Sequence, residues 1–253
     1  MLKKDNIAVQ LYSVREAMQA DFEGTIRKLA DFGYRVLEVA TLPESVSPKQ
    51  AKALFDELGI TVTSAHSPLP TRDTATEVID TLRTLGSPYL VCPWLDPDPY
   101  FADLDGVKKA CNLLNKAYAT VQAHGLTLAY HNHWFEMNII DGKPAYQHML
   151  NLLEPAIVFE LDVYWTQVGG QDIQRVMQDL EGRLPLLHVK DGPADKIESN
   201  MTAVGNGVLD MPAVLSASTS DWHIVELDRC STDMLEAIEN SYNYLVGQSE
   251  QNA

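Results

Sequence analysis

The sequence predicts an α/β protein, a single (β/α)8 TIM barrel spanning residues 1–253, and three observations lead to this fold class. Eight short runs rich in β-forming residues recur along the chain, and amphipathic segments separate them. A strand followed by a helix and another strand favours parallel pairing, because parallel neighbours need a crossover connection. The length of 253 residues also matches the roughly 250 residues of a typical eight-stranded α/β barrel. A doubly wound open sheet is the alternative, but its dinucleotide-binding version lacks the G-x-G-x-x-G fingerprint after the first strand.

The elements follow each other in a regular β then α order. The predicted strands are residues 7–13, 36–40, 61–66, 88–94, 126–133, 157–162, 184–191 and 222–228. Apolar residues at three- and four-residue spacing predict helices within residues 22–33, 47–59, 74–86, 106–125 and 233–247. A glycine follows four of these helices directly, where a left-handed C-cap is needed: Gly33, Gly59, Gly86 and Gly125.

Composition and charge narrow the class of protein. With 19 basic and 35 acidic residues, the formal charge of −16 repels a polyphosphate backbone, which argues against nucleic acid as a partner. Three cysteines without C-x-x-C spacing indicate neither a disulfide framework nor a zinc knuckle. The first sixteen residues, MLKKDNIAVQLYSVRE, contain no apolar run long enough for a signal peptide or a membrane span. We therefore expect a cytoplasmic protein without a membrane partner.

Side chains that can bind metals gather at the predicted carboxyl ends of strands, where barrel enzymes build their active sites. Four of the seven histidines lie there, and two carboxylates end further strands: His66, His131, His133, His188, Asp162 and Glu226. A mixture of imidazole and carboxylate ligands suits a divalent ion. Each of these residues alone is also a common hydrogen-bonded structural group. Their shared position is what predicts a metal site.

Three further features have two interpretations each. The longest irregular stretch, residues 191–208, is either a loop that covers the substrate or a plain surface insertion. Trp94, Trp134 and Trp165 lie at or just beyond strand ends, where they either stack on a ligand or pack in the core. Lys190 lies two residues after His188 and so on the same strand face. It either contacts the substrate or pairs with an acid such as Asp191 or Glu226.

A series of motifs in chain order resembles the sugar phosphate isomerase/epimerase family, the xylose isomerase-like barrels. The motifs are QLYSVRE with DFEGTIRKLADFGYRVLEVA, SAHSP, YHNHWFE, FELDVYW, HVKDG, VGNGVLD and VELDRC. Each is weak alone, but together they span nearly the whole chain. The resemblance implies a divalent metal held by His131, Asp162, His188 and Glu226. Mn²⁺ is the first candidate, with Mg²⁺, Co²⁺ or Zn²⁺ as alternatives.

The resemblance also implies roles for other residues, with one departure. In the ketose epimerase branch, a fifth-strand glutamate is a ligand and pairs with the eighth-strand glutamate in proton transfer. Here His131 stands in its place, and Glu136 is the alternative ligand or base. The expected catalytic residues are thus Glu226, His133 and Glu136. The expected substrate contacts are Glu38, His66, Lys190 and Trp165.

These expectations define a leading function and its alternatives. The leading function is a metal-dependent isomerase or epimerase that acts on a monosaccharide or keto-sugar through an enediolate. A dehydratase or lyase, resembling inosose dehydratase or a keto-glycoside hydratase, is favoured by His131 and His133, since an imidazolium can protonate a leaving hydroxyl. A non-catalytic sugar-binding module is a third class. The partner is a small-molecule sugar in each case, and the sequence leaves a homodimer open.

Overall fold

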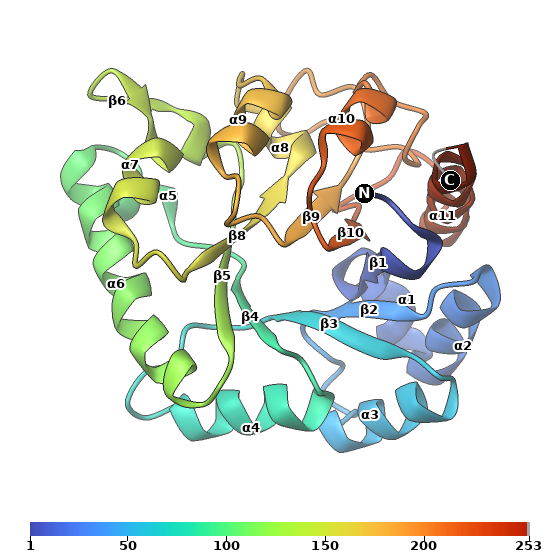
Figure 1. Ribbon diagram of the computed structural model, residues 1–253. Coiled ribbons are helices and arrows are strands. Elements are labelled where there is room, and N and C mark those ends of the chain that lie inside the picture. Colours follow the sequence, from blue (N-terminus) through green and yellow to red (C-terminus); the bar gives the residue numbers. More distant parts are fainter. Residues whose placement is uncertain (252–253) are drawn as a thin grey trace.

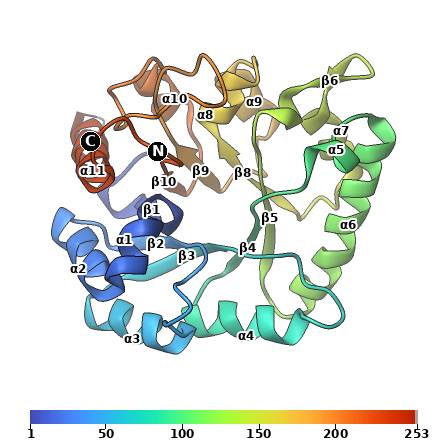
Figure 2. The ribbon, with the colours of Figure 1, turned by 180° about the vertical axis from the view of Figure 1, so that it is seen from behind.

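The computed structural model describes residues 1–251, which form a closed barrel of parallel strands surrounded by helices (Figures 1 and 2). Going round the barrel from β1 through β2, the strands follow chain order until the last one, β10, pairs with β1. They are β1 (Ile7–Gln10), β2 (Val36–Val39), β3 (Thr61–His66), β4 (Tyr89–Cys92), β5 (Thr127–His131), β8 (Val158–Asp162), β9 (Leu186–Val189) and β10 (Trp222–Val225). The predicted (β/α)8 fold class is confirmed, and each predicted strand contains one of these.

Helices cover the outside of the barrel, and their ends show local sequence signals. They are α1 (Arg15–Ala20), α2 (Phe22–Phe32), α3 (Pro48–Glu57), α4 (Ala75–Leu85), α5 (Pro97–Tyr100), α6 (Leu104–Ala123), α7 (Ala145–Leu152), α8 (Val163–Val168), α9 (Ile173–Asp179), α10 (Met211–Ala217) and α11 (Met234–Gln251). Ser47 and Gln50 form a capping box at the start of α3. The predicted left-handed glycines are confirmed, with φ of 113° at Gly33 and 80° at Gly86, for example.

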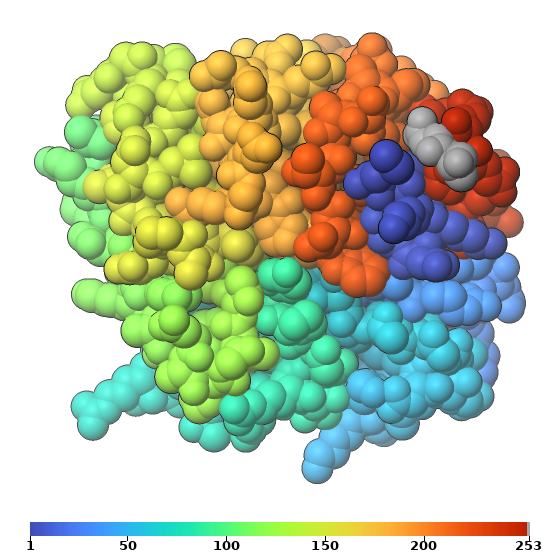
Figure 3. Space-filling model, in the orientation of Figure 1, coloured from blue at the N-terminus to red at the C-terminus, as the bar shows by residue number. Residues whose placement is uncertain are grey.

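The ends of the chain meet on one side of the barrel. Figure 3 shows the first residues packed against the orange and red C-terminal segments. The register agrees with this picture, because Ile7 pairs with His223 and Val9 pairs with Val225. The contact between the first and last strands closes the barrel.

A small antiparallel hairpin between β5 and α7 was not predicted. Its strands are β6 (Ile139–Ile140) and β7 (Lys143–Pro144), and Asp141 and Gly142 turn the chain with φ of 46° and 84°. Positive φ at both central residues is typical of a type I′ hairpin turn, for which Asp-Gly is a preferred pair. Two-residue strands are too short to give a periodic pattern in the sequence.

The inside of the barrel contains an apolar layer. It consists of Ala8, Val36, Val91, Ala129, Leu186 and Ile224. A second and larger core fills the space between the strands and the helices. Because side chains alternate between the two faces of a strand, the next inward position lies two residues on. That position is polar in most of the strands, and the site is built there.

The irregular stretch after β9 is held together by one buried carboxylate. Asp191 accepts hydrogen bonds from the backbone N–H groups of Gly192, Gly205 and Gly207 at 2.9–3.0 Å, and of Leu209 at 3.3 Å. The carboxylate of Asp191 thus binds the loop backbone, and the ion pairs of its neighbour Lys190 are with other acids. Within residues 1–251, no helix is both long enough and apolar enough to cross a membrane.

Candidate functional site

A cavity of about 500 Å³ opens at the carboxyl ends of the strands. Its walls come from segments far apart in the chain: Tyr12, Ala40, Thr41, His66, Ser67, Pro68, Pro93, Trp94, His131, His133, Trp134, Trp165, Glu226, Asp228 and Arg229. All of these residues end a strand or follow one. Residues 191–208 do not contribute to this lining among the described residues, so the structure gives no support for a substrate-covering role of that loop.

The four residues predicted to bind a metal meet at the base of this cavity. Side-chain ligand atoms of His131, Asp162, His188 and Glu226 all lie within 4.8 Å of one another, and all four residues are buried. We call these four residues the outer group. Nδ1 of His188 lies 2.8 Å from Oε2 of Glu226, and Nε2 of His131 lies 3.9 Å from Oδ2 of Asp162. Residues from β5, β8, β9 and the end of β10 therefore converge as predicted.

The donor atoms of the outer group fit a divalent cation. Two imidazoles and two carboxylates form a ligand set that Mn²⁺, Co²⁺ and Zn²⁺ all accept. Oδ1 of Asp162 accepts a hydrogen bond of 2.8 Å from the backbone N–H of Trp165, which fixes the carboxylate. Its buried Oδ2 has no hydrogen-bond partner among the described residues, although it lies 2.9 Å from Nζ of Lys190. A buried carboxylate oxygen aimed at other ligands is what a cation site needs.

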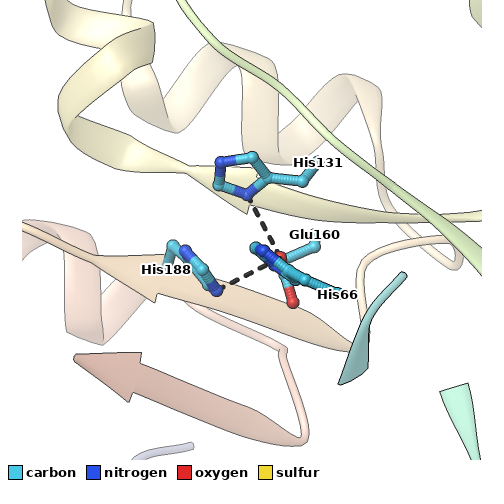
Figure 4. Close-up of side chains that lie close together, drawn as sticks. All are labelled: His66, His131, Glu160 and His188. Carbon is cyan, nitrogen blue, oxygen red and sulfur yellow. Dashed lines mark hydrogen bonds and ion pairs between the residues drawn. The ribbon is translucent and has the colours of Figure 1, made fainter. Parts of the chain in front are cut away.

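A second cluster of potential ligands shares two histidines with the outer group. We call it the inner group, and it consists of His66, His131, Glu160 and His188 (Figure 4). Oε2 of Glu160 lies 2.7 Å from Nε2 of His66, and 3.1 Å from both Nδ1 of His131 and Nε2 of His188. Sequence analysis missed Glu160. Its position two residues before Asp162 in one strand puts it on the same face, and that spacing is the signal that would have found it.

Glu38 extends this network below the cavity. Its Oε2 atom lies 2.6 Å from Nε2 of His188 and accepts a hydrogen bond of 2.6 Å from Nε2 of Gln10. Burial and the neighbouring Glu160 raise the pKa of Glu38 to about 7. Glu38 is wholly buried and is absent from the described residues that line the cavity, whereas His66 does line it. Of these two predicted substrate contacts, only His66 is placed where a substrate could touch it.

Lys190 is fully buried among carboxylates. Its Nζ atom lies 2.6 Å from Glu226, 2.9 Å from Asp162 and 3.2 Å from Asp228. Burial alone would lower the pKa of Lys190, but Asp162, Asp228 and Glu226 together raise it well above its usual range. Of the two predicted roles, the structure shows the pairing with acids, and the partners include Glu226.

The electrostatic surroundings of Glu226 keep its carboxylate ionised. Burial favours the neutral acid, but the charges of Lys190 and His188 outweigh it and hold the pKa of Glu226 well below its usual range. Glu226 lines the cavity and is buried except for 3% of its surface. A carboxylate that is ionised and also faces the cavity can accept a proton.

Glu136 lies outside both groups of ligands. It belongs to a 3₁₀ turn, Phe135–Met137, where its Oε1 accepts a hydrogen bond of 2.5 Å from the Tyr130 hydroxyl. Its Oε2 accepts one of 2.8 Å from the backbone N–H of His133. Burial raises the pKa of Glu136 to about 7. The carboxylate does not bend back toward the outer group, so the geometry does not support Glu136 as the fifth-strand ligand.

Aromatic rings form one wall of the cavity around His133. The ring of His133 meets Trp94 edge to face, with 4.5 Å between centroids, and Trp134 lies 5.1 Å from Trp165. Burial and the nearby His131 lower the pKa of His133 well below its usual range, so its imidazole is neutral. The predicted substrate contact Trp165 lines the cavity, and so do Trp94 and Trp134. Trp94 is 45% exposed, which leaves part of its ring accessible to a ligand.

Comparison with known proteins agrees with this fold. The model of the xylose isomerase-like TIM barrel family matches residues 26–218. A sugar phosphate isomerase/epimerase from Parabacteroides distasonis has 25% identical residues and a TM-score of 0.80, over 96% of this chain and 93% of that one. No curated protein sequence matches this chain.

Two more distant structures share the fold. The IOLI protein, described with a bound zinc atom, has 16% identity and a TM-score of 0.77, over 97% of this chain and 98% of that one. A probable 3-DHS dehydratase, AsbF, from Bacillus anthracis has 10% identity and a TM-score of 0.76, over 95% and 98% of the two chains. Fold and site thus define an α/β barrel with a ligand cluster at the carboxyl ends of its strands. The chain belongs to the xylose isomerase-like TIM barrel family, and the resemblance seen in the sequence is confirmed.

Proposed function

We propose that this protein is a metal-dependent sugar isomerase or epimerase that moves a proton on a carbon next to a carbonyl group. The observation that carries the proposal is the meeting of His131, Asp162, His188 and Glu226 at the base of a cavity of about 500 Å³. A divalent ion held there would polarise a carbonyl oxygen and stabilise the negative charge of an enediolate. The substrate would be a monosaccharide or keto-sugar.

Glu226 is the residue best placed to take the proton. It is ionised, faces the cavity and is held by His188 at 2.8 Å and Lys190 at 2.6 Å. Epimerisation also needs a group that returns a proton to the opposite face of the intermediate. His133 lines the cavity from the aromatic wall and is a second candidate for proton transfer. Asp162 is fixed by Trp165 and serves as a ligand only.

The dehydratase alternative rests on a histidine that donates a proton to a leaving hydroxyl. Burial lowers the pKa of His131 to about 3, and the pKa of His133 is also well below its usual range. Both imidazoles are therefore neutral near pH 7, which suits a metal ligand or a base better than an acid. A neutral imidazole is a weak donor to a leaving hydroxyl, so a dehydratase would need another acid, whereas the base that begins an isomerisation is the ionised Glu226.

The test is a panel of ketoses, inososes and 3-keto-glucosides with Mn²⁺ in deuterated water, followed by NMR. We expect exchange of a carbon-bound proton with solvent, and a product with the mass of the substrate apart from deuterium. Glu226→Gln should lower the rate at least about a hundredfold, within the 10²–10⁴ that general acid–base catalysis contributes. Glu181→Gln, an exposed carboxylate outside the site, is the matched control.

Each other outcome points to a different function. Loss of one water from the substrate would establish the dehydratase instead. Binding of a sugar without metal-dependent exchange across the whole panel would support the non-catalytic binding module. Unchanged exchange in Glu226→Gln would remove Glu226 from the reaction.

A further inference from the structure

The two histidines shared by the inner and outer groups divide their ring nitrogens between them. His131 turns Nδ1 to Glu160 at 3.1 Å and Nε2 to Asp162 at 3.9 Å. His188 does the reverse: its Nε2 faces Glu160 at 3.1 Å and Glu38 at 2.6 Å, and its Nδ1 faces Glu226 at 2.8 Å. Each ring thus has one nitrogen on the inner carboxylates and the other on the outer ones.

An imidazole that binds a cation through one nitrogen keeps a proton on the other. That N–H commonly donates to a carboxylate, which fixes the tautomer and the ring orientation. If one group holds the cation, the carboxylates of the other group therefore accept these two protons. Filling both groups at once would require both rings to lose their second proton as well. The geometry allows one cation, with one group as ligands and the other as support.

The position of the carboxylates distinguishes the two groups. The outer group contains two carboxylates, and one of them, Glu226, lines the cavity, whereas the inner group reaches the cavity through His66 and the shared His131. In the inner group, Glu160 is wholly buried and Oε2 already has three imidazole nitrogens within 3.1 Å. A substrate in the cavity can reach a cation beside Glu226, whereas Oε2 of Glu160 and of Glu38 already faces the histidines and Oε1 of each has no hydrogen-bond partner among the described residues.

We propose that Glu160, assisted by Glu38, is the positioning carboxylate of the metal site and sets opposite tautomers in its two histidine ligands. In the metal-bound protein, Glu160 accepts the Nδ1–H of His131, a contact of 3.1 Å that is not yet a hydrogen bond in the structure, while Glu160 and Glu38 accept the Nε2–H of His188. The cation is then bound by Nε2 of His131 and by Nδ1 of His188. This inference rests on the proposed function, because it requires that the outer group binds a metal.

Tautomers can be measured directly in the unmodified protein. The experiment loads the protein with Zn²⁺, which is diamagnetic, after labelling its histidines with ¹⁵N, and records long-range ¹⁵N–¹H correlations. His131→Gln and His188→Gln assign the signals. We expect the proton on Nδ1 of His131 and on Nε2 of His188. The same tautomer in both rings, or the reverse of this pattern, would overturn the proposal.

Metal affinity separates the inner group from the outer group. In a calorimetric titration with Mn²⁺, we expect one ion per chain and an affinity for Glu160→Gln about 10–100-fold weaker, the usual effect of losing such a support. Asp162→Asn, which removes a direct ligand, should weaken binding more than Glu160→Gln does. His66→Gln is the matched control, because His66 contacts Glu160 but is absent from the outer group. His66→Gln should change the affinity for Mn²⁺ by less than about tenfold.

The outcomes distinguish this inference from the proposed function. Unchanged affinity in Glu160→Gln, with loss in Asp162→Asn, would overturn the positioning role and leave the metal site intact. Loss in His66→Gln together with retention in Asp162→Asn would place the cation in the inner group. Absence of any metal binding by the unmodified protein would remove the proposed function itself. Should Glu160→Gln fail to fold, the tautomer measurement decides the question alone.

Discussion

Two layers inside the barrel differ in nearly every physical property, although they are built by the same strands. Five strands place an apolar residue in the lower layer and, two positions on, a polar residue in the upper layer. The pairs are Ala8 and Gln10, Val36 and Glu38, Ala129 and His131, Leu186 and His188, and Ile224 and Glu226. The lower layer is a packed apolar core. The upper layer consists of buried polar and ionisable side chains. Each strand therefore places the residues that stabilise the barrel below the residues that form the site.

The upper layer costs free energy that the lower layer must offset. Taking a carboxylate or an ammonium group out of water is unfavourable by several kcal/mol per ion unless close partners compensate it. Here compensation is extensive, since Lys190 has three carboxylates within 3.2 Å. Such a network is weak evidence for stability, so we interpret it as a functional site. Variants that separate the two layers test this interpretation.

The largest expected effect is on turnover, from a change in the upper layer of β10. Glu226→Gln should lower the rate by about 10²–10⁴. Lys190 keeps Asp162 and Asp228 as partners in this variant. The free energy of unfolding should therefore change less than in Ile224→Ala. Steady-state kinetics and urea unfolding of the same preparation measure both quantities. A large loss of stability without a loss of rate would show that the upper layer stabilises the fold and does not carry the reaction.

Two residues earlier in the chain, Ile224→Ala should act in the opposite way. Ile224 is fully buried in the lower layer, and its truncation leaves a cavity. The expected cost is about 2–5 kcal/mol of unfolding free energy, with the rate per folded molecule retained. Val39→Ala, on the outer side of the barrel wall, is the comparison for a smaller truncation. Equal loss of rate in Ile224→Ala would show that the layers are coupled.

At the lower end of β10, His223 predicts a pH dependence of stability. Burial, and then the N-terminal charge, lower the pKa of His223 to about 4. Between that value and the unfolded pKa of about 6.5, the unfolded chain binds a proton that the folded chain does not. Stability from this group is therefore full above about pH 6.5 and is lost as the pH falls.

The difference between the unmodified protein and His223→Gln isolates this group from all other titrations. On going from about pH 7 to about pH 4.5, the unmodified protein should lose about 2–3 kcal/mol more unfolding free energy than the variant. Urea unfolding of both proteins at both pH values gives the four free energies of unfolding that this comparison needs. A parallel loss in the two proteins would mean that His223 is protonated in the folded state.

The smallest expected effect is at the rim of the cavity. Trp94 is 45% exposed and packs edge to face on His133. Trp94→Ala should raise the KM for a sugar by about tenfold or less, since an aromatic contact contributes roughly 0.5–1.5 kcal/mol. Trp94→Phe should retain most of the affinity. An unchanged KM in Trp94→Ala would assign this ring to packing alone.

The convergence of the outer group could be predicted from the sequence, because two rules determine where these residues lie. Strand and helix alternation closes the barrel, and the residues at the carboxyl ends of its strands then face one mouth. Glu160 was overlooked because only the last residue of its strand, Asp162, was considered. The two-residue alternation that separates them would have placed both inside.

Other parts of the site depend on contacts that no local pattern contains. The turn after β5 directs Glu136 to the Tyr130 hydroxyl, so its path is set by tertiary packing. Asp191 was considered as a partner of Lys190, but it binds backbone groups as far away as Leu209. A carboxylate that organises a loop this long can be recognised only once the loop has been folded.

The central claim is that His131, Asp162, His188 and Glu226 hold one divalent cation in the upper layer. The most direct measurement is anomalous diffraction at the manganese edge from crystals grown with Mn²⁺. The account predicts one strong peak within bonding distance of Nε2 of His131, Nδ1 of His188 and the carboxylates of Asp162 and Glu226. A peak between Glu160 and His66, or no peak in the barrel, would contradict it.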